Sequence, residues 1–200
     1  CQTTVTTDVF VSDVFANENL RTPASMQLQI PSCNSKKLPE YKQSILALFQ
    51  PSSDAKITGC ERVRMDSMLQ VSFKSEIATK QSSADLIFMR HDYDHEKYTV
   101  KGIKPVLNPL FLERIKTLMD KKMQKLEYDD LKFSVVLNND SRDTVKVTNY
   151  NLWVDGTPYE SYKDQDLERR EKITATFSNV TSDLILQGKQ PIVLWISKLK

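Results

Sequence analysis

Apolar side chains at every second position are the feature that most limits how this chain can fold. In residues 25–30 (SMQLQI), Met26, Leu28 and Ile30 fall on one face of an extended chain. The pattern recurs in KITGCERVRM, SMLQVSFKSEIA, ADLIFMRHDY and KYTVKGI, and later in LKFSVVLNND and DTVKVTNYNLWVDG. This period is typical of strands with one buried face, and the polar turns between them favour antiparallel hairpins.

Two segments follow the helical period instead. Residues 35–50 begin with a capping Ser35, carry Pro39 in the first turn and end before Pro51. Residues 108–128 place apolar side chains in a stripe opposite a face that is mostly lysine. The sequence therefore predicts an α+β fold, with antiparallel sheets or meanders and two main amphipathic helices, which can divide into two lobes.

The expected division has three parts. Residues 1–20 form an N-terminal tether and a first strand, residues 21–104 one α+β lobe, and residues 105–200 a second lobe in which a helix precedes a β-rich region. The first seven residues are small and polar apart from Val5. Such a segment buries little surface, so we expect an extended or poorly ordered tether there unless it joins a sheet edge.

Composition excludes two classes of function. The 28 Lys and Arg residues nearly balance the 26 Asp and Glu residues, and no long run of like charge occurs. Because nucleic-acid binding needs a clustered basic surface, we expect no nucleic-acid partner. The longest apolar runs are far shorter than the roughly 20 residues of a membrane-spanning helix.

The chain has three cysteines, at positions 1, 33 and 60. A bridge between Cys33 and Cys60 would close a loop of about 28 residues and leave Cys1 without a partner. The alternative is three free thiols in a cytosolic protein. We predict the Cys33–Cys60 disulfide, which requires an oxidising compartment.

The first residues, CQTTVTT, resemble the start of a mature bacterial lipoprotein, and the whole chain is similar to small uncharacterised lipoproteins of proteobacteria and their prophages. The resemblance implies a lipid, with palmitate-type acyl chains, on Cys1. Gln2, where an Asp would favour the inner membrane, implies an outer-membrane anchor with the body facing the periplasm. The sequons at Asn139 and Asn179 favour the alternative of a secreted protein.

Catalytic chemistry has one candidate, the segment HDYDHE at residues 91–96. It contains both histidines of the chain, His91 and His95, beside Asp92, Asp94 and Glu96. No other histidine exists to complete a zinc ligand set and the internal cysteines are assigned to a bridge, so a solvated hairpin tip is the favoured interpretation. The sequence contains no G-x-S-x-G, G-x-G-x-x-G or P-loop motif. We therefore expect a lipid-anchored, non-enzymatic binding or assembly factor with an envelope protein as partner and no cofactor. The alternative is a small exported hydrolase that uses His91, His95 and the neighbouring acidic residues.

Overall fold

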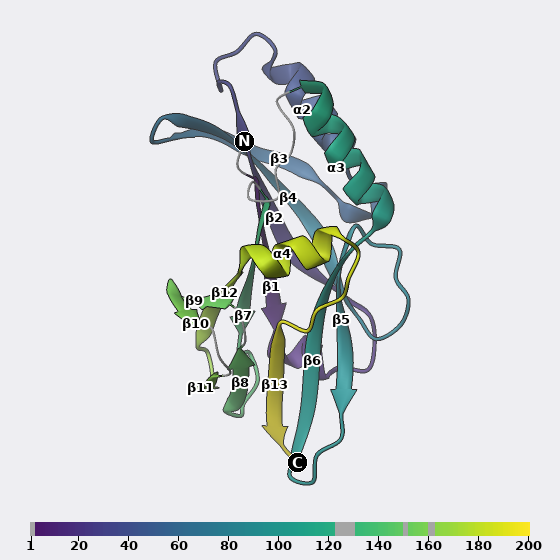
Figure 1. The fold of residues 1–200 in the computed structure, drawn as a ribbon, viewed down its shortest axis with the longest axis vertical. Coiled ribbons are helices and arrows are strands. Elements are labelled where there is room, and N and C mark those ends of the chain that lie inside the picture. The colour runs from purple at the N-terminus through teal and green to yellow at the C-terminus, as the bar shows by residue number, and fades with distance from the viewer. Residues whose placement is uncertain (1–2, 123–130, 150–151, 160–162) are drawn as a thin grey trace.

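Strands dominate the computed structural model, which describes residues 3–122, 131–149, 152–159 and 163–200 (Figure 1). The strands are β1 (Thr3–Phe10), β2 (Leu20–Ile30), β3 (Lys56–Val63), β4 (Asp66–Ala78), β5 (Leu86–Tyr93), β6 (Tyr98–Leu107), β7 (Leu131–Asn138), β8 (Val145–Asn149), β9 (Leu152–Val154), β10 (Thr157–Tyr159), β11 (Lys163–Leu167), β12 (Lys172–Phe177) and β13 (Leu194–Leu199). The helices are α1 (Val11–Phe15), α2 (Leu38–Leu46), α3 (Pro109–Lys122), α4 (Asn179–Leu186) and the short 3-10 helix η1 (Pro51–Ser53).

All of these strands belong to one sheet, in the order β10-β9-β12-β7-β1-β2-β4-β5-β6-β13-β8-β11, with β3 paired to β4 outside this path. The expected α+β fold with two main helices is therefore wrong, because the protein is mostly β and its helices are small additions to the sheet. The pairing of β1 with β7 and of β4 with β5 is parallel. The sequence pattern had favoured antiparallel neighbours, so the parallel pairing of β4 with β5 corrects that expectation.

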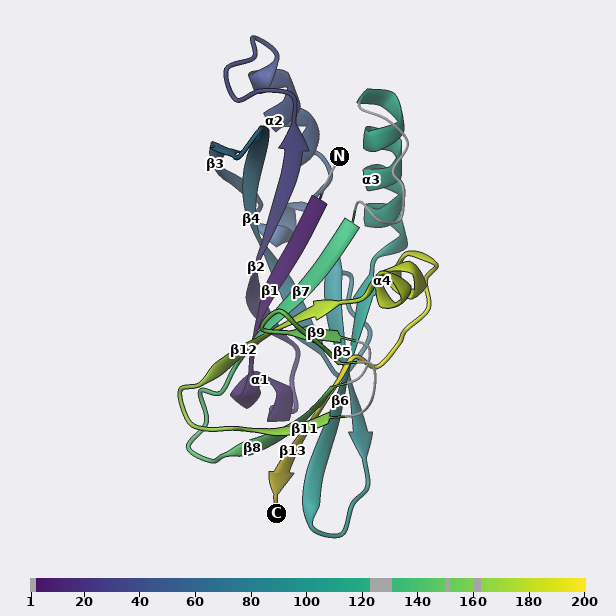
Figure 2. The ribbon, with the colours of Figure 1, turned by 60° about the vertical axis from the view of Figure 1, so that its left-hand side comes forward.

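The sheet curls strongly. Strands β8 and β9 are separated by only residues 150–151, yet β8 pairs with β13 and β9 pairs with β12, at opposite ends of the strand order. Since two residues span at most roughly 11 Å between their flanking neighbours, the two ends of the sheet must approach each other. Figure 2 shows β9 and β11, which come from opposite ends of the strand order, in the same region of the molecule.

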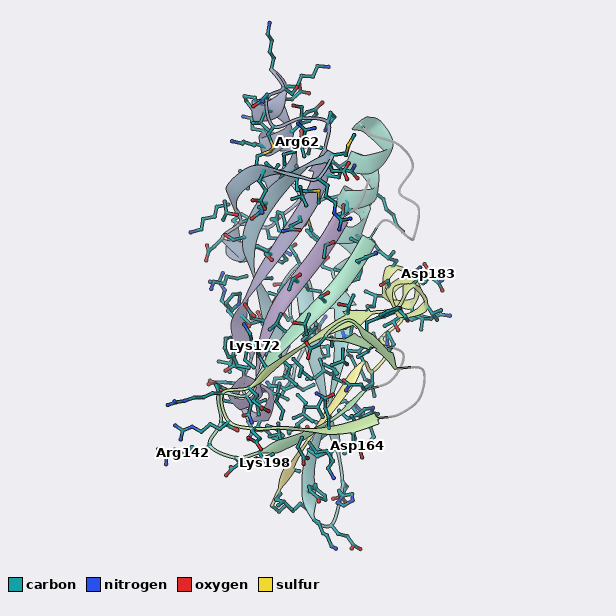
Figure 3. The ribbon with its side chains drawn as sticks, turned by 90° about the vertical axis from the view of Figure 1, so that its left-hand side faces the viewer. Arg62, Arg142, Asp164, Lys172, Asp183 and Lys198 are labelled. Carbon is teal, nitrogen blue, oxygen red and sulfur yellow. A yellow bond between two sulfur atoms is a disulfide. The ribbon has the colours of Figure 1, made fainter. Side chains whose placement is uncertain are left out.

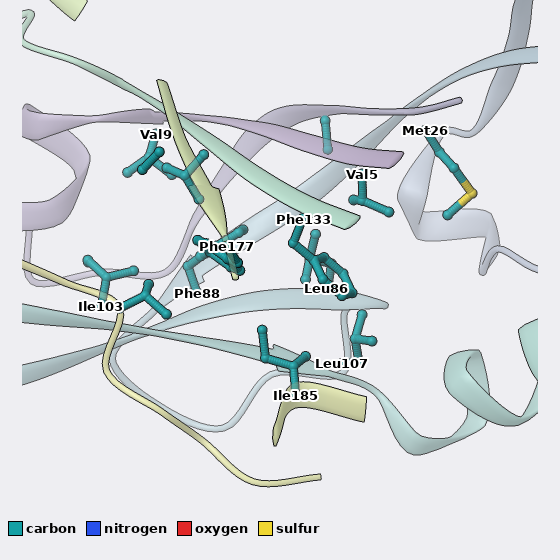
Figure 4. Packing of buried hydrophobic residues seen from close by; sticks show 14 of the residues in the cluster. Val5, Val9, Met26, Leu86, Phe88, Ile103, Leu107, Phe133, Phe177 and Ile185 are labelled. Carbon is teal, nitrogen blue, oxygen red and sulfur yellow. The ribbon is translucent and has the colours of Figure 1, made fainter. Parts of the chain in front are cut away.

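The core fills the inside of the curled sheet (Figure 4). As the alternation predicted, Met26, Leu28 and Ile30 of β2 are all buried. At one end of the molecule α2 and α3 cover the core, and the Phe49 ring lies 4.9 Å from Phe73 and 5.2 Å from Phe111 between ring centroids. Burying these aromatic faces is what positions both helices against the sheet.

The N-terminal segment differs from the expected tether. Thr3–Phe10 forms β1, which lies inside the sheet between β2 and β7. Its buried face includes Thr3, Val5 and Thr7. Threonine is β-branched and suits a strand, so a segment with few apolar residues still pairs on both sides.

Helix α1 follows β1 and is held by a buried arginine. The guanidinium of Arg90, on the inner face of β5, donates to the backbone carbonyls of Asp13, Ala16 and Glu18. Burial lowers the pKa of Arg90, and the nearby carboxylates of Asp92, Asp13 and Glu18 oppose this shift. The pKa of Asp13 is raised, chiefly by burial and then by the charge of Asp140.

Several finer features follow the sequence pattern. Asp155 and Gly156 form a turn with left-handed backbone, and Gly188, with a φ of 78°, follows the end of α4. The proposed division between residues 104 and 105 falls within β6. Among the described helices, none has the length and apolarity needed to span a bilayer.

Candidate functional site

The two histidines lie in and beside the β5–β6 hairpin, as predicted for the HDYDHE segment. His91 is exposed on the outer face of β5, and its ring meets Tyr93 edge-on at 4.9 Å between centroids. His95 lies in the connecting turn, where its Nδ1 accepts from the backbone N–H groups of Lys97 and Tyr98. These contacts give His95 a role in shaping the turn.

His91 belongs to an aromatic cluster that packs over a glycine. The rings of Tyr93 and Trp195 are 4.0 Å apart between centroids, and they cover Gly102 of β6. A Cβ at Gly102 would lie 3.4 Å from Tyr93 Cε2 and 3.5 Å from Trp195 Cε3. Aromatic side chains that fill the space above a strand glycine stabilise the sheet, so packing accounts for this cluster.

Metal chemistry finds no further support at the hairpin. Within the described ranges, no group of three or more His, Cys, Asp or Glu side chains is arranged to hold a metal ion. Cys33 and Cys60 are joined in the predicted disulfide, with their Cα atoms 5.7 Å apart. The predicted lipidation site, Cys1, lies outside the described residues.

A hollow of about 490 Å³ beside β9 and the start of α4 is the strongest candidate for a binding site. Its lining consists of Lys132, Trp153, Thr176, Phe177, Ser178, Asn179 and Val180. Trp153 is 47% exposed and Val180 is 65% exposed, whereas Phe177 is only 3% exposed. This hollow, which we call the Trp153 hollow, therefore has two exposed apolar side chains among its lining residues.

The local sequence explains how the hollow forms. Trp153 pairs with Thr176 across β9 and β12, so its side chain lies on the outer face of the sheet. The chain then leaves β12 and enters α4, whose first turn is capped when Ser178 Oγ accepts from the Thr181 N–H. Because this cap begins the helix directly after β12, Asn179 and Val180 lie close to the end of that strand.

Polar side chains continue from the hollow across the outer face. Thr176 pairs with Ser134, their hydroxyl oxygens 3.1 Å apart, and Ser134 pairs in turn with Thr6. The row continues through Ser25 and Ser72 on the next strands. An apolar centre beside hydrogen-bonding groups is the usual anatomy of a protein interface.

Two other hollows are less suited to binding. One of about 230 Å³ contains Arg21 and Asp54, which already form an ion pair at 2.8 Å. Another, of about 390 Å³, lies between α2 and α3, where Arg114 donates to the Leu48 carbonyl. In both, the arginine is already engaged within the protein.

Sequence reasoning did not find the Trp153 hollow. Trp153 was part of an expected hairpin, and the alternation pattern places it on a polar face. A tryptophan on the solvent face of a strand was the available signal. Its meeting with Val180 depends on the pairing of β9 with β12, which no local pattern predicts.

Comparison with known proteins gives a family without an assigned activity. The family model described as a domain of unknown function (DUF7424) matches residues 3–199, almost the whole chain. No curated protein matches this chain.

Proposed function

For this chain, which belongs to the DUF7424 family, we propose a role as a non-enzymatic binding protein of the bacterial cell envelope. Its partner is another envelope protein, which docks at the Trp153 hollow. The observation that carries the proposal is the exposure of Trp153 and Val180 around a hollow of about 490 Å³.

The chemistry of the hollow favours a protein partner. Tryptophan is enriched among the residues that dominate binding energy at protein interfaces. The volume is large enough to admit a large apolar side chain of the partner, and Lys132 at the same site favours a neighbouring carboxylate. The disulfide supports a location in an oxidising compartment such as the periplasm.

Replacing Trp153 by alanine is expected to weaken partner binding by roughly 30-fold, which corresponds to about 2 kcal/mol for an interface anchor. Peptides selected from a displayed library on the wild-type protein provide the probe, and their affinities are measured by titration calorimetry. We expect selected peptides that combine a large apolar residue with an acidic one.

Leu110→Ala is the matched control, because Leu110 is 60% exposed on α3 and does not line the hollow. Its affinity for the selected peptides should equal that of the wild type. Peptides that bind the Trp153→Ala variant as tightly as the wild type would show that docking occurs elsewhere.

The second part of the proposal is the anchor, a lipid on Cys1. Substituting Cys1→Ser in the precursor is expected to release the protein from the membrane fraction, because one residue change removes every acyl chain. The disulfide and the unfolding midpoint should be unchanged. The two forms are compared by fractionation after high-salt washing, and retention of the serine form in the pellet would contradict acylation as the anchor.

A further inference from the structure

The hairpin of β3 and β4 ends in an exposed tip, residues 62–65, with the sequence Arg-Val-Arg-Met. Among the described strands β3 pairs only with β4, and a register shift between Ile57 and Gly59 interrupts this pairing. Met65 is 87% exposed and Val63 is 45% exposed. Edge hairpins normally place charged or turn-forming residues at such positions, so two exposed apolar side chains here call for a contact outside the protein.

The backbone of the tip adds a second observation. Arg64 has a φ of 58°, in the left-handed region that glycine or asparagine normally occupies in a two-residue turn. The turn itself gains nothing from an arginine side chain at this position. The chain thus carries an arginine at a tip position where glycine would fit with less strain, and its charged side chain is available for a contact outside the protein.

Strand register places the tip at the end of the molecule where β1 begins. Thr3 pairs with Leu28, Leu28 with Leu69, and Leu69 with Cys60. The tip begins two residues beyond Cys60, roughly 7 Å further along the strand direction, on the side from which the chain enters β1 at Thr3. Figures 1 and 2 show the start of β1 and the β3–β4 hairpin toward the same end of the molecule.

The same end carries further positive charge. The disulfide ties Cys33 to Cys60 of β3, and the exposed Lys36 and Lys37 follow three and four residues later. Figure 3 shows Arg62 at the end opposite Arg142 and Lys198. Of the two carboxylates beside the tip, Glu61 accepts from the Gln70 side chain and Asp66 accepts from the Gln29 side chain. The negative charges of Glu61 and Asp66 offset the positive charges of the two tip arginines. Lys36 and Lys37 therefore give this end its positive charge.

We propose that the β3–β4 tip inserts into the headgroup region of an anionic lipid bilayer. Val63 and Met65 enter the interface, while Arg62 and Arg64 extend their long side chains to the lipid phosphates. Lys36 and Lys37 add electrostatic attraction to the same surface. The choice of a bilayer rests on the proposed envelope location.

The test uses the full chain with Cys1→Ser, so that no acyl chain contributes. Sedimentation is measured with vesicles of phosphatidylcholine alone and of equal parts phosphatidylcholine and phosphatidylglycerol. We expect binding only to the anionic vesicles, and a loss of about tenfold in the Val63→Gln, Met65→Gln double variant. Leu110→Gln, which alters an exposed leucine on α3, should bind like the parent chain.

Arg64→Gly separates a structural role from a binding role. Glycine relieves the left-handed backbone, so the unfolding midpoint should stay the same or rise, while binding to anionic vesicles falls about fivefold. Absence of binding to anionic vesicles, or equal binding by the double variant, would overturn the proposal. Peptide affinity at the Trp153 hollow is measured separately, so the two proposals fail independently.

Discussion

The Arg90→Met variant is expected to lose about 3 to 5 kcal/mol of the free energy of unfolding, the largest effect of a single substitution that we anticipate. Arg90 is 7% exposed and donates to three backbone carbonyls at and after α1, one of them Asp13 O at 2.7 Å. Methionine fills a similar volume without donors, and each carbonyl left unsatisfied costs about 1 to 3 kcal/mol. For a chain of this length the loss lowers the melting temperature by about 10 °C.

Urea unfolding measures this effect, and Arg90→Lys is its control. Lysine keeps the charge but cannot span all three carbonyls, so its loss should be smaller. Amide hydrogen exchange should also show faster opening of Val14 and its neighbours in the methionine variant. A loss below about 1 kcal/mol would mean that water satisfies these carbonyls in place of Arg90.

Removing the disulfide should have the second largest effect. The bridge joins residues 27 apart in the sequence, and the chain-entropy treatment assigns about 3 to 4 kcal/mol to a loop of this size. The Cys33→Ser, Cys60→Ser double variant should therefore melt about 10 °C below the wild type. It should also lose order in residues 31–37, the segment that the bridge ties to β3.

Reducing the wild-type protein with dithiothreitol should produce the same shift, and Cys1→Ser should produce none. Thiol titration of the unfolded, unreduced wild type should find Cys1 as its one available thiol at most. Three reactive thiols in protein folded under oxidising conditions would contradict the bridge.

The sequence predicted those features that depend on neighbours along the chain. The alternation of Met26, Leu28 and Ile30 predicted the buried face of β2. Pro39 indicated the helix that forms as α2, although its N-cap is Lys37 and not the predicted Ser35. The disulfide was predicted because the chain has three cysteines and a bridge between Cys33 and Cys60 closes a loop of ordinary length. Each of these predictions depends on the spacing of side chains within a short segment or on the number of cysteines.

The architecture escaped prediction because partners far apart in sequence decide it. Thr3–Thr7 carries one apolar residue, yet β1 lies between β2 and β7, and its partner Leu131 is more than a hundred residues away. Alternation shows that a segment is a strand and which face is buried, but it is silent on which strand pairs with it. The curled sheet, and the meeting of Trp153 with Val180, both depend on such pairings.

The most direct test of the proposed function is photo-crosslinking in living cells from a benzoylphenylalanine placed at Val180, which is 65% exposed at the Trp153 hollow. We predict one discrete adduct with an envelope protein, which disappears when Trp153 is replaced by alanine and persists with Leu110→Ala. The same probe at the exposed Gln43 on α2 should not form that adduct. An adduct of equal yield with and without Trp153, or no adduct at Val180, would contradict docking at this hollow.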